Sequence, residues 1–364
     1  MQRNSITLFI GSLSSGGAEH QIAQLANFLY EKGYSVSIVT YADIPDHYPV
    51  DNAIRRIRLG EGKNPLAKFL AIFLFFIRIK TDCIISYTQR ANSFMLPALF
   101  FRRRIKVIVG ERNFTFGKVT IHEKLLFGLL YKRADYIVPN SVSQSHYIIE
   151  HYPSYVNKVV VITNYTDINK YTSEGIPICN VIKIAVFGRY SPQKNCIKFA
   201  HAIYMLRKKS VIPFEIHWYG NKMVHNSISP YYIEFENTIK ELGLSDIFFL
   251  HEHVLNVKEE MCKFELLCLP SLYEGFSNSL SEYICCGRPV LASNVSDNAL
   301  MVRNGENGYL FKPQSVDDIC GAFESYFSLT REERMSMGIR SRKIAESLFD
   351  KEKFIISYIR LIES

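Results

Sequence analysis

Two glutamates that stand eight residues apart, Glu274 and Glu282, lie in a segment suited to binding a phosphorylated ligand. The segment follows the apolar run Leu266–Leu269, which predicts a strand, and it then predicts the start of a helix. The first backbone amides of a helix have no partner within it and attract phosphate. Glu282 is expected about one turn into this helix, where its carboxylate can accept hydrogen bonds from ribose hydroxyls. The residues between the two glutamates that we expect to bind the same ligand are Gly275, Phe276, Ser277, Asn278 and Ser279.

A second segment has two cations directly after a predicted strand, Ile184–Phe187. Arg189 and Lys194 flank a turn that begins with Gly188. Two cations in this position can hold a diphosphate and neutralise its charge as it leaves. A solvated basic loop would have the same composition, so this segment alone leaves both interpretations open.

A third segment, from Gly11 to Glu19, joins the predicted strand Ile6–Ile10 to a helix and contains Gly16 and Gly17. Glycines at this point let the backbone approach a ligand closely. Their spacing is not G-x-G-x-x-G, so the dinucleotide-binding fingerprint is absent. A tight turn without a ligand is the alternative.

Both halves of the chain alternate short apolar strands with helical patterns. Such a pattern is typical of parallel sheets covered on both faces by helices. The predicted strands of the first half are Ile6–Ile10, Val36–Tyr41, Cys83–Ser86, Val107–Gly110 and Tyr136–Pro139. Those of the second half are Ile184–Phe187, Phe214–Tyr219, Ile247–Leu250, Leu266–Leu269 and Pro289–Ala292. The polar stretch Asn164–Asn180 reads as a linker between them. We therefore predict an α/β protein of two doubly wound, Rossmann-like domains that face each other across a ligand-binding cleft.

The charge distribution indicates the kind of partner, and the cysteines indicate the compartment. Residues 1–170 contain 21 Lys and Arg against 12 Asp and Glu, a net charge of +9, whereas residues 171–364 contain 22 against 23, a net charge of −1. The basic half favours an anionic partner such as a phosphorylated substrate or an acidic lipid leaflet, and no nucleic-acid-binding motif accompanies it. The eight cysteines form no C-x-x-C pair, which favours buried free thiols in the cytoplasm.

Two segments bear on membrane contact. The longest apolar stretch, Phe69–Ile77, is too short to span a bilayer. It belongs to Leu66–Ile79, which we interpret as a buried crossover helix in preference to a surface helix. The basic cluster Arg102–Arg104 with Lys106 follows two phenylalanines, a combination that suits lipid headgroups. A solvated basic turn is the alternative.

Taken in order along the chain, these motifs resemble those of the retaining glycosyltransferases of family 4, which have the GT-B fold. The resemblance is strongest in PSLYEGFSNSLSEYICCGRPVLAS, which contains Glu274 and Glu282. It extends to the turn Gly16-Gly17-Ala18-Glu19, to Gly188-Arg189 with Lys194, to Asn164-Tyr-Thr-Asp167 and to the late turn Gly305-Glu-Asn-Gly308-Tyr309-Leu310.

The resemblance implies a division of labour between domains. Residues 1–168 would bind the acceptor, residues 169–345 would bind a nucleotide sugar, and residues 346–364 would form a helix that packs back on the first domain. Glu282 would bind the ribose, while Glu274, Arg189 and Lys194 would contact the donor sugar and diphosphate and act in catalysis. Gly16 and Gly17 would also contact the donor, and His253 would lie against the base. No cofactor and no metal are expected, since no D-x-D motif is present.

The chain departs from the family after the predicted strand Val107–Gly110. Many members have a histidine near this loop, whereas here the sequence reads Gly110-Glu111-Arg112-Asn113. We therefore expect Arg112 and Asn113, together with Glu19, to contact the acceptor or the donor sugar. A charged loop that caps the next helix is the alternative.

The resulting expectation is a metal-independent hexosyl- or N-acetylhexosaminyltransferase. It would use a nucleotide sugar, with a UDP-sugar favoured, and a glycan or lipid-linked saccharide acceptor in bacterial surface polysaccharide synthesis, as for lipopolysaccharide or capsule. It would work in the cytoplasm or on the inner face of the cell membrane, touching that membrane peripherally through the basic N-terminal domain. Two alternatives remain open from the residues: a nucleotide-sugar epimerase of similar fold, and a non-catalytic nucleotide-sugar-binding protein.

Overall fold

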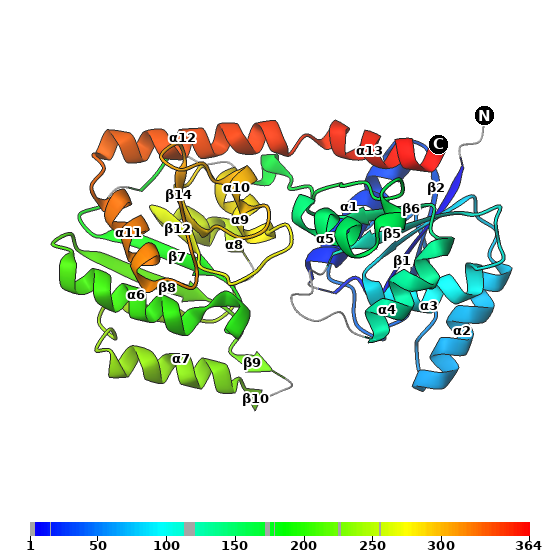
Figure 1. Cartoon of the computed structure of the whole chain (residues 1–364), viewed down its shortest axis with the longest axis horizontal. Helices are drawn as coiled ribbons and strands as arrows, with labels where there is room; N and C mark the ends of the chain where they lie inside the picture. Colours follow the sequence, from blue (N-terminus) through cyan, green and yellow to red (C-terminus); the bar gives the residue numbers. More distant parts are fainter. Residues whose placement is uncertain are drawn as a thin grey trace. The chain divides into compact units, whose positions relative to one another are not determined.

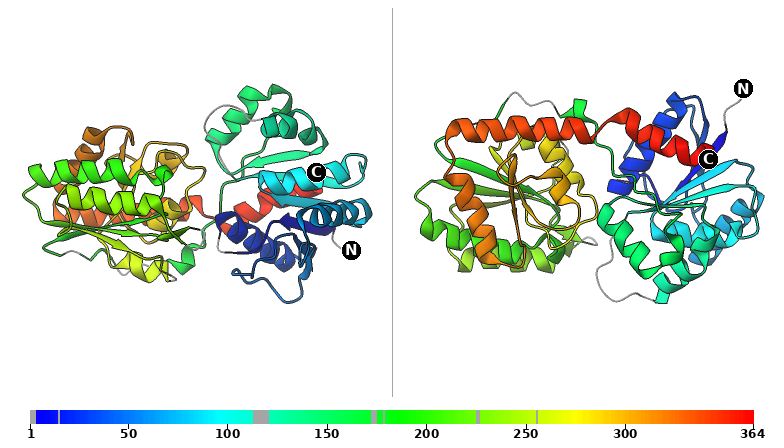
Figure 2. Two further views of the ribbon diagram at one scale, coloured as in Figure 1. Left: turned by 90° about the horizontal axis from the view of Figure 1, so that it is seen from below. Right: turned by 45° about the horizontal axis from the view of Figure 1, so that its top comes forward.

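The computed structural model describes residues 4–14, 16–112, 121–171, 175–177, 179–224, 227–254 and 256–364 (Figure 1). The chain forms two compact units. The first comprises Met1–Tyr165 together with Lys351–Ser364, and the second comprises Thr166–Asp350. Each unit is built on a parallel six-stranded sheet with helices on both faces (Figure 2). The predicted α/β class with two doubly wound sheets is confirmed.

The first unit has the strand order β3-β2-β1-β4-β5-β6. Its strands are β1 (Ser5–Ile10), β2 (Ser35–Thr40), β3 (Arg55–Arg58), β4 (Cys83–Tyr87), β5 (Lys106–Glu111) and β6 (Tyr136–Pro139). Its helices are α1 (Gly17–Glu31), α2 (Pro65–Arg78), α3 (Gln89–Leu99), α4 (Ile121–Gly128), α5 (Val142–His151) and α13 (Lys351–Glu363), with the 3-10 turns η1 (Leu130–Arg133) and η2 (Pro153–Tyr155). Side chains alternate across each strand, so Leu8 and Ile10 pack in one core while Phe9 packs in another on the opposite face.

The second unit has the strand order β11-β8-β7-β12-β13-β14, plus a small antiparallel pair. Its strands are β7 (Ile182–Phe187), β8 (Phe214–Tyr219), β9 (Met223–Val224), β10 (Ser227–Ile228), β11 (Phe248–His251), β12 (Leu266–Leu269), β13 (Val290–Ser293) and β14 (Gly308–Phe311). Its helices are α6 (Cys196–Lys209), α7 (Pro230–Glu241), α8 (Val257–Cys262), α9 (Asn278–Cys285), α10 (Asn298–Met301), α11 (Val316–Phe327) and α12 (Arg331–Leu348), with η3 (Ile168–Lys170) and η4 (Pro192–Lys194).

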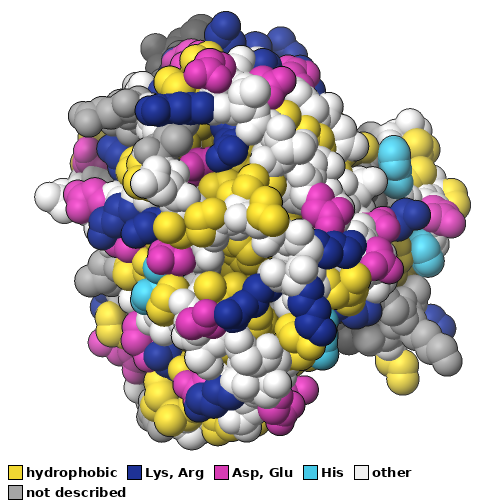
Figure 3. Space-filling view, turned by 90° about the vertical axis from the view of Figure 1, so that its left-hand side faces the viewer, with side chains coloured by type: hydrophobic (Ala, Val, Ile, Leu, Met, Phe, Trp, Pro, Cys, Tyr) yellow, Lys and Arg dark blue, Asp and Glu magenta, His cyan; other side chains and the backbone are white. Residues whose placement is uncertain are grey.

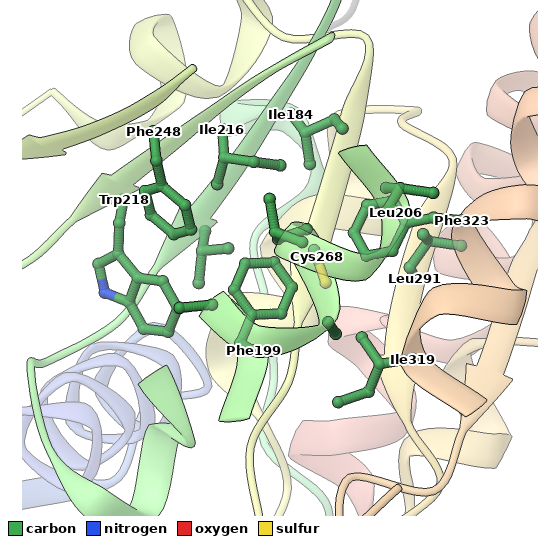
Figure 4. Packing of buried hydrophobic residues seen from close by; sticks show 14 of the residues in the cluster. Ile184, Phe199, Leu206, Ile216, Trp218, Phe248, Cys268, Leu291, Ile319 and Phe323 are labelled. Carbon is green, nitrogen blue, oxygen red and sulfur yellow. The ribbon is translucent and has the colours of Figure 1, made fainter. Parts of the chain in front are cut away.

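Aromatic and aliphatic side chains fill the core on one face of the second sheet. Trp218 is fully buried there and lies against Phe199 (Figure 4). Phe323 of α11 completes this layer from the other side of Phe199. Because Trp218 is the only tryptophan of the chain, it reports on this unit alone.

The strand order decides which loops meet. In both units the chain reverses direction across the sheet after its third strand, so the first and fourth strands are neighbours. In the second unit these are β7 and β12, which pair through Ile184 and Leu266. Ligands of open α/β sheets bind at the carboxyl ends of such a pair. The loops after Phe187 and Leu269 are the two that contain the predicted cations and glutamates.

Three sequence predictions differ from the structure. β3 was not predicted, because the run Arg55–Arg58 is charged and lies at the exposed edge of its sheet. β14 was predicted as part of a turn, although Gly308 pairs with Val290 and begins an edge strand. The segment Leu66–Ile79, predicted as a buried crossover helix, forms α2 with only Ile72 and Phe76 buried. In the part of the chain that the structure describes, we find no helix with the length and hydrophobicity needed to traverse a bilayer.

Candidate functional site

The candidate site of the second unit begins where the loops after β7 and β12 are tied together. Gln193 lies in the first loop, and its side-chain amide donates to the backbone oxygen of Tyr273 at 3.1 Å. The backbone nitrogen of Leu272 donates to the backbone oxygen of Gln193 at 2.8 Å. These bonds hold the two loops in register, although Gln193 was not among the predicted site residues.

A buried ion pair joins one predicted cation to one predicted glutamate. The ammonium nitrogen of Lys194 lies 2.6 Å from a carboxylate oxygen of Glu274. Both residues are buried, with 8% and 9% of their surface exposed. A charge at this depth is stable only with a partner, so each side chain fixes the other.

Local backbone geometry positions Lys194. It ends η4, and the next residue, Asn195, has a left-handed backbone with φ of 60° before α6 begins. The Asn195 side-chain amide donates to the backbone oxygen of Pro313 at 2.8 Å, which anchors this conformation. Gly188 leaves room for the lysine stem, because a Cβ at that position would lie 3.2 Å from it.

Arg189 behaves differently from Lys194. Its side chain is exposed and donates to the side-chain oxygen of Gln193 at 3.4 Å. The structure therefore brings together Lys194 and Glu274, and leaves the Arg189 guanidinium at the surface of the same loop.

The loop after β12 ends in the N-terminus of α9. Ser277 is the N-cap, and its hydroxyl accepts from the backbone nitrogen of Leu280 at 3.3 Å. Phe276 is buried and packs edge-on against Phe349, which anchors the loop. The predicted ligand-binding residues Gly275, Asn278 and Ser279 are half-buried along this turn.

Glu282 lies within α9 and is half-buried. The hydroxyl of Tyr171 donates a hydrogen bond to its carboxylate. Burial raises the pKa of Glu282 to about 7, and the bond from Tyr171 opposes this rise. The backbone oxygen of Tyr171 accepts from Arg342 of α12, which holds the tyrosine in place. Sequence reasoning missed Tyr171, because no local spacing relates a residue within the linker to α9.

His253 is exposed in the loop after β11. His251 is more enclosed: its ring stacks on Tyr219 at 4.4 Å and its Nε2 lies 3.0 Å from Nδ1 of His217. Burial lowers the pKa of both His251 and His217. The two imidazole rings are nearly parallel, and His251 stacks on the buried Tyr219 near the carboxyl ends of β8 and β11.

In the first unit, the turn after β1 brings Glu19 back over the start of α1. Gly16 is the N-cap of α1, and a Cβ on it would lie 2.0 Å from a Glu19 carboxylate oxygen. A side chain at position 16 would thus displace Glu19, whereas Gly17 is exposed at the first position of the helix. Burial raises the pKa of Glu19.

The side chain of Arg112 is enclosed by other residues of the first unit and is not open to solvent. Its side chain is buried, donates to the Tyr358 hydroxyl at 2.6 Å and to the Asn164 side-chain oxygen at 3.2 Å, and lies over the Tyr87 ring. These contacts anchor α13 and the end of the first unit. Asn113, the other residue predicted for this loop, lies outside the described residues.

The model of the family described as "Glycosyltransferase Family 4" matches residues 15–170, and that of "Glycosyl transferases group 1" matches residues 179–344. Together they span most of the chain.

Two relatives from Campylobacter jejuni act on lipid-linked saccharides according to their names. An N-acetylgalactosamine-N,N'-diacetylbacillosaminyl-diphospho-undecaprenol 4-alpha-N-acetylgalactosaminyltransferase is 25% identical, over 95% of this chain and 96% of its own length. A GalNAc-alpha-(1->4)-GalNAc-alpha-(1->3)-diNAcBac-PP-undecaprenol alpha-1,4-N-acetyl-D-galactosaminyltransferase is 25% identical, over 76% of each chain.

Solved structures with the same fold include Anabaena HepE in complex with UDP and glucose, with a TM-score of 0.82, 18% identity and full coverage of both chains. The sucrose-phosphate synthase of Thermosynechococcus elongatus has a TM-score of 0.80 and 17% identity, covering 99% of this chain and 98% of its own. The fold is therefore GT-B, as the resemblance implied. The chain belongs to glycosyltransferase family 4 and is a glycosyltransferase.

Proposed function

We propose that this glycosyltransferase retains anomeric configuration and moves a hexose or N-acetylhexosamine from a UDP-sugar to a lipid-linked saccharide during bacterial surface polysaccharide synthesis. The observation that supports it most is the buried Lys194–Glu274 pair beside Glu282 and the N-terminus of α9. The names of the Campylobacter relatives support the acceptor class and an N-acetylhexosamine. An Escherichia coli relative, 26% identical over 39% of this chain, is named a UDP-Gal:alpha-D-GlcNAc-diphosphoundecaprenol alpha-1,3-galactosyltransferase, which supports UDP.

The donor would bind to the second unit through groups of complementary charge. The Glu282 carboxyl group accepts hydrogen bonds from the ribose diol, and the amides at the start of α9 receive a phosphate. Lys194 contacts the diphosphate on one side while it keeps Glu274 on the other. Glu274 then accepts a hydrogen bond from a hydroxyl of the donor sugar, and Arg189 closes over the phosphates from the surface. The exposed His253 lies on the loop that would border the base.

The chemistry would be a same-face substitution at the anomeric carbon. The bond from this carbon to the phosphate oxygen breaks, and a bond to the acceptor hydroxyl oxygen forms. The acceptor proton passes to the leaving phosphate oxygen. Lys194 and Arg189 stabilise the negative charge that develops there, a role that requires no divalent metal. Glu274 and Glu282 bind substrate in this scheme and are not a glycosidase-type acid and base.

The first unit would bind the acceptor, with Glu19 at the carboxyl end of its sheet, while the Gly16–Gly17 turn beside it would contact the donor. With a lipid-linked acceptor, the enzyme would work at the inner face of the cell membrane.

The experiment is a panel of nucleotide sugars, scored by nucleotide release with and without a membrane lipid extract and with and without EDTA. We expect release with a UDP-sugar that requires the extract, survives EDTA, and is abolished by Glu274→Ala. The NMR coupling at the new anomeric centre reports retention. Release without any acceptor, or an inverted product, would contradict the proposal.

A further inference from the structure

The helix α2 of the first unit exposes an apolar stripe to solvent. Its residues Leu66, Leu70, Leu74 and Ile77 recur every three or four positions and therefore lie on one side of the helix. They are 79%, 53%, 38% and 41% exposed. Phe69 flanks the stripe at 40% exposure. Soluble surfaces rarely expose so many large apolar side chains together, so this stripe points to a partner.

The other side of α2 explains why the helix stays in place. Ile72 and Phe76 are fully buried, and Phe76 packs edge-on against Phe9 of the central strand. Asn64 caps the helix by accepting from the backbone nitrogen of Ala67 at 2.9 Å. The helix is thus fixed by its inner side, and in Figures 1 and 2 it lies at the outer edge of its unit.

A basic cluster lies at the C-terminal end of α2. The Arg102 guanidinium donates to the backbone oxygen of Ile77 at 2.6 Å and to that of Phe76 at 3.2 Å. These two bonds hold the segment that contains Arg102 against the end of α2. The neighbouring side chains of Arg103, Arg104 and Phe101 are exposed there, Phe101 at 89%, next to the end of the stripe.

Charge within each of two segments here is of one sign. Residues 63–80 contain four basic and no acidic residues, and residues 100–106 contain four basic and no acidic residues. The exposed Asp82 and Asp135 lie beside the second segment, hydrogen-bonded to Lys106 and Val107. The face of the second unit in Figure 3 differs, because basic and acidic side chains are interspersed around its apolar groups. An apolar stripe beside a basic cluster matches the acyl boundary and headgroups of an anionic bilayer.

We infer that the exposed side of α2, with Phe101, Arg103 and Arg104, is a docking surface for an anionic lipid bilayer. The helix lies in the plane of the interface with its leucines among the acyl chains, while the arginines contact lipid phosphates. The 14 residues of α2 allow such a position but not a crossing. Such a surface would bring the enzyme to a lipid-linked acceptor, and for this purpose alone the inference rests on the proposed function.

The test is sedimentation of the full chain with vesicles of phosphatidylglycerol and phosphatidylcholine, compared with vesicles of phosphatidylcholine alone. We expect binding to the anionic vesicles that high salt weakens, and much weaker binding to the neutral ones. The stripe variant, Leu66→Gln/Leu70→Gln/Leu74→Gln, should bind anionic vesicles roughly tenfold or more weakly. The cluster variant, Arg103→Ser/Arg104→Ser, should bind anionic vesicles roughly thirtyfold more weakly.

A matched control removes exposed apolar side chains elsewhere. Val211→Gln/Ile339→Gln alters residues of the second unit that are 97% and 59% exposed, and it should bind as the unaltered chain does. Circular dichroism melting checks that each variant is folded. UDP affinity, measured by calorimetry, should be equal in all of them, and its absence in the unaltered chain would count against the proposed function without affecting the vesicle result.

Three outcomes would overturn the inference. In the first, the stripe variant sediments with anionic vesicles as well as the unaltered chain. In the second, neutral and anionic vesicles bind equally and salt has no effect. In the third, light scattering shows a dimer that the stripe variant converts to a monomer, which would make this side of α2 an interface between copies.

Discussion

Removing the Lys194 ammonium should destabilise the second unit far more than removing an exposed lysine of the same unit. In Lys194→Met the Glu274 carboxylate keeps its place at 9% exposure and loses the ammonium 2.6 Å away. Breaking a buried pair in this way costs about 3–5 kcal/mol, because one charge is left without compensation. That is a large share of the roughly 5–15 kcal/mol that stabilises a typical domain.

Trp218 provides the assay. It is fully buried in the core of the second unit and is the sole tryptophan, so its fluorescence during urea unfolding follows that unit and not the first. The matched control is Lys240→Met, which breaks an exposed pair with Glu236 at 2.8 Å. An exposed pair of this kind contributes less than about 1 kcal/mol.

A double-mutant cycle separates the pair from its surroundings. Glu274→Gln in the Lys194→Met background removes the orphaned charge, so the double variant should be more stable than Lys194→Met alone. The reasoning would be refuted if Lys194→Met cost no more than Lys240→Met, or if the two substitutions were additive. UDP binding should fall in both single variants, measured by calorimetry.

Three further changes test the site and the fold. Glu282→Gln should remove a pH dependence: because burial raises the pKa of Glu282 to about 7, the native state holds a proton that the unfolded chain releases above about 4.5, and stability declines as pH rises from about 4.5 to about 7. The variant should therefore be more stable than the unaltered chain at pH above 7, by about 1–2 kcal/mol after allowance for solvent screening. Urea unfolding followed by Trp218 fluorescence at acid and alkaline pH measures this difference in stability. A difference that is the same at both pH values would contradict the assignment. Tyr171→Phe should weaken UDP binding severalfold by removing the hydrogen bond that orients the Glu282 carboxylate; an unchanged Kd by calorimetry would mean that the tyrosine does not position the glutamate. Gly308→Ala should destabilise the second unit by more than about 2 kcal/mol, since a Cβ there would lie 1.8 Å from the backbone oxygen of Val290, and unfolding at the unaltered urea midpoint would show that β13 and β14 separate without cost.

Local sequence specified the elements that bury continuous apolar runs. Strands such as Leu266–Leu269 and the glycine-containing turn before Ser277 follow from patterns within a few residues, because hydrophobic periodicity and helix capping are local properties. The edge strands β3 and β14 escaped the same reasoning. The hydrogen bonds of both strands come from neighbouring strands. The side chains of β3 need no apolar pattern at an exposed edge. Those of β14 are apolar, but Gly308, with which this strand begins, belongs to the late turn that the sequence indicated.

By itself, the sequence determined that two cations and two glutamates follow the first and fourth strands of a doubly wound sheet. Only the tertiary structure decided how they pair. Lys194 and Glu274 are 80 positions apart and meet because β7 and β12 are neighbours. Tyr171 reaches Glu282 from the segment before β7, where Arg342 of α12 holds its backbone oxygen. The sequence of α2 does not show which of its apolar residues are buried and which are exposed. Only packing against the sheet decides that Ile72 and Phe76 lie on the inner side of the helix.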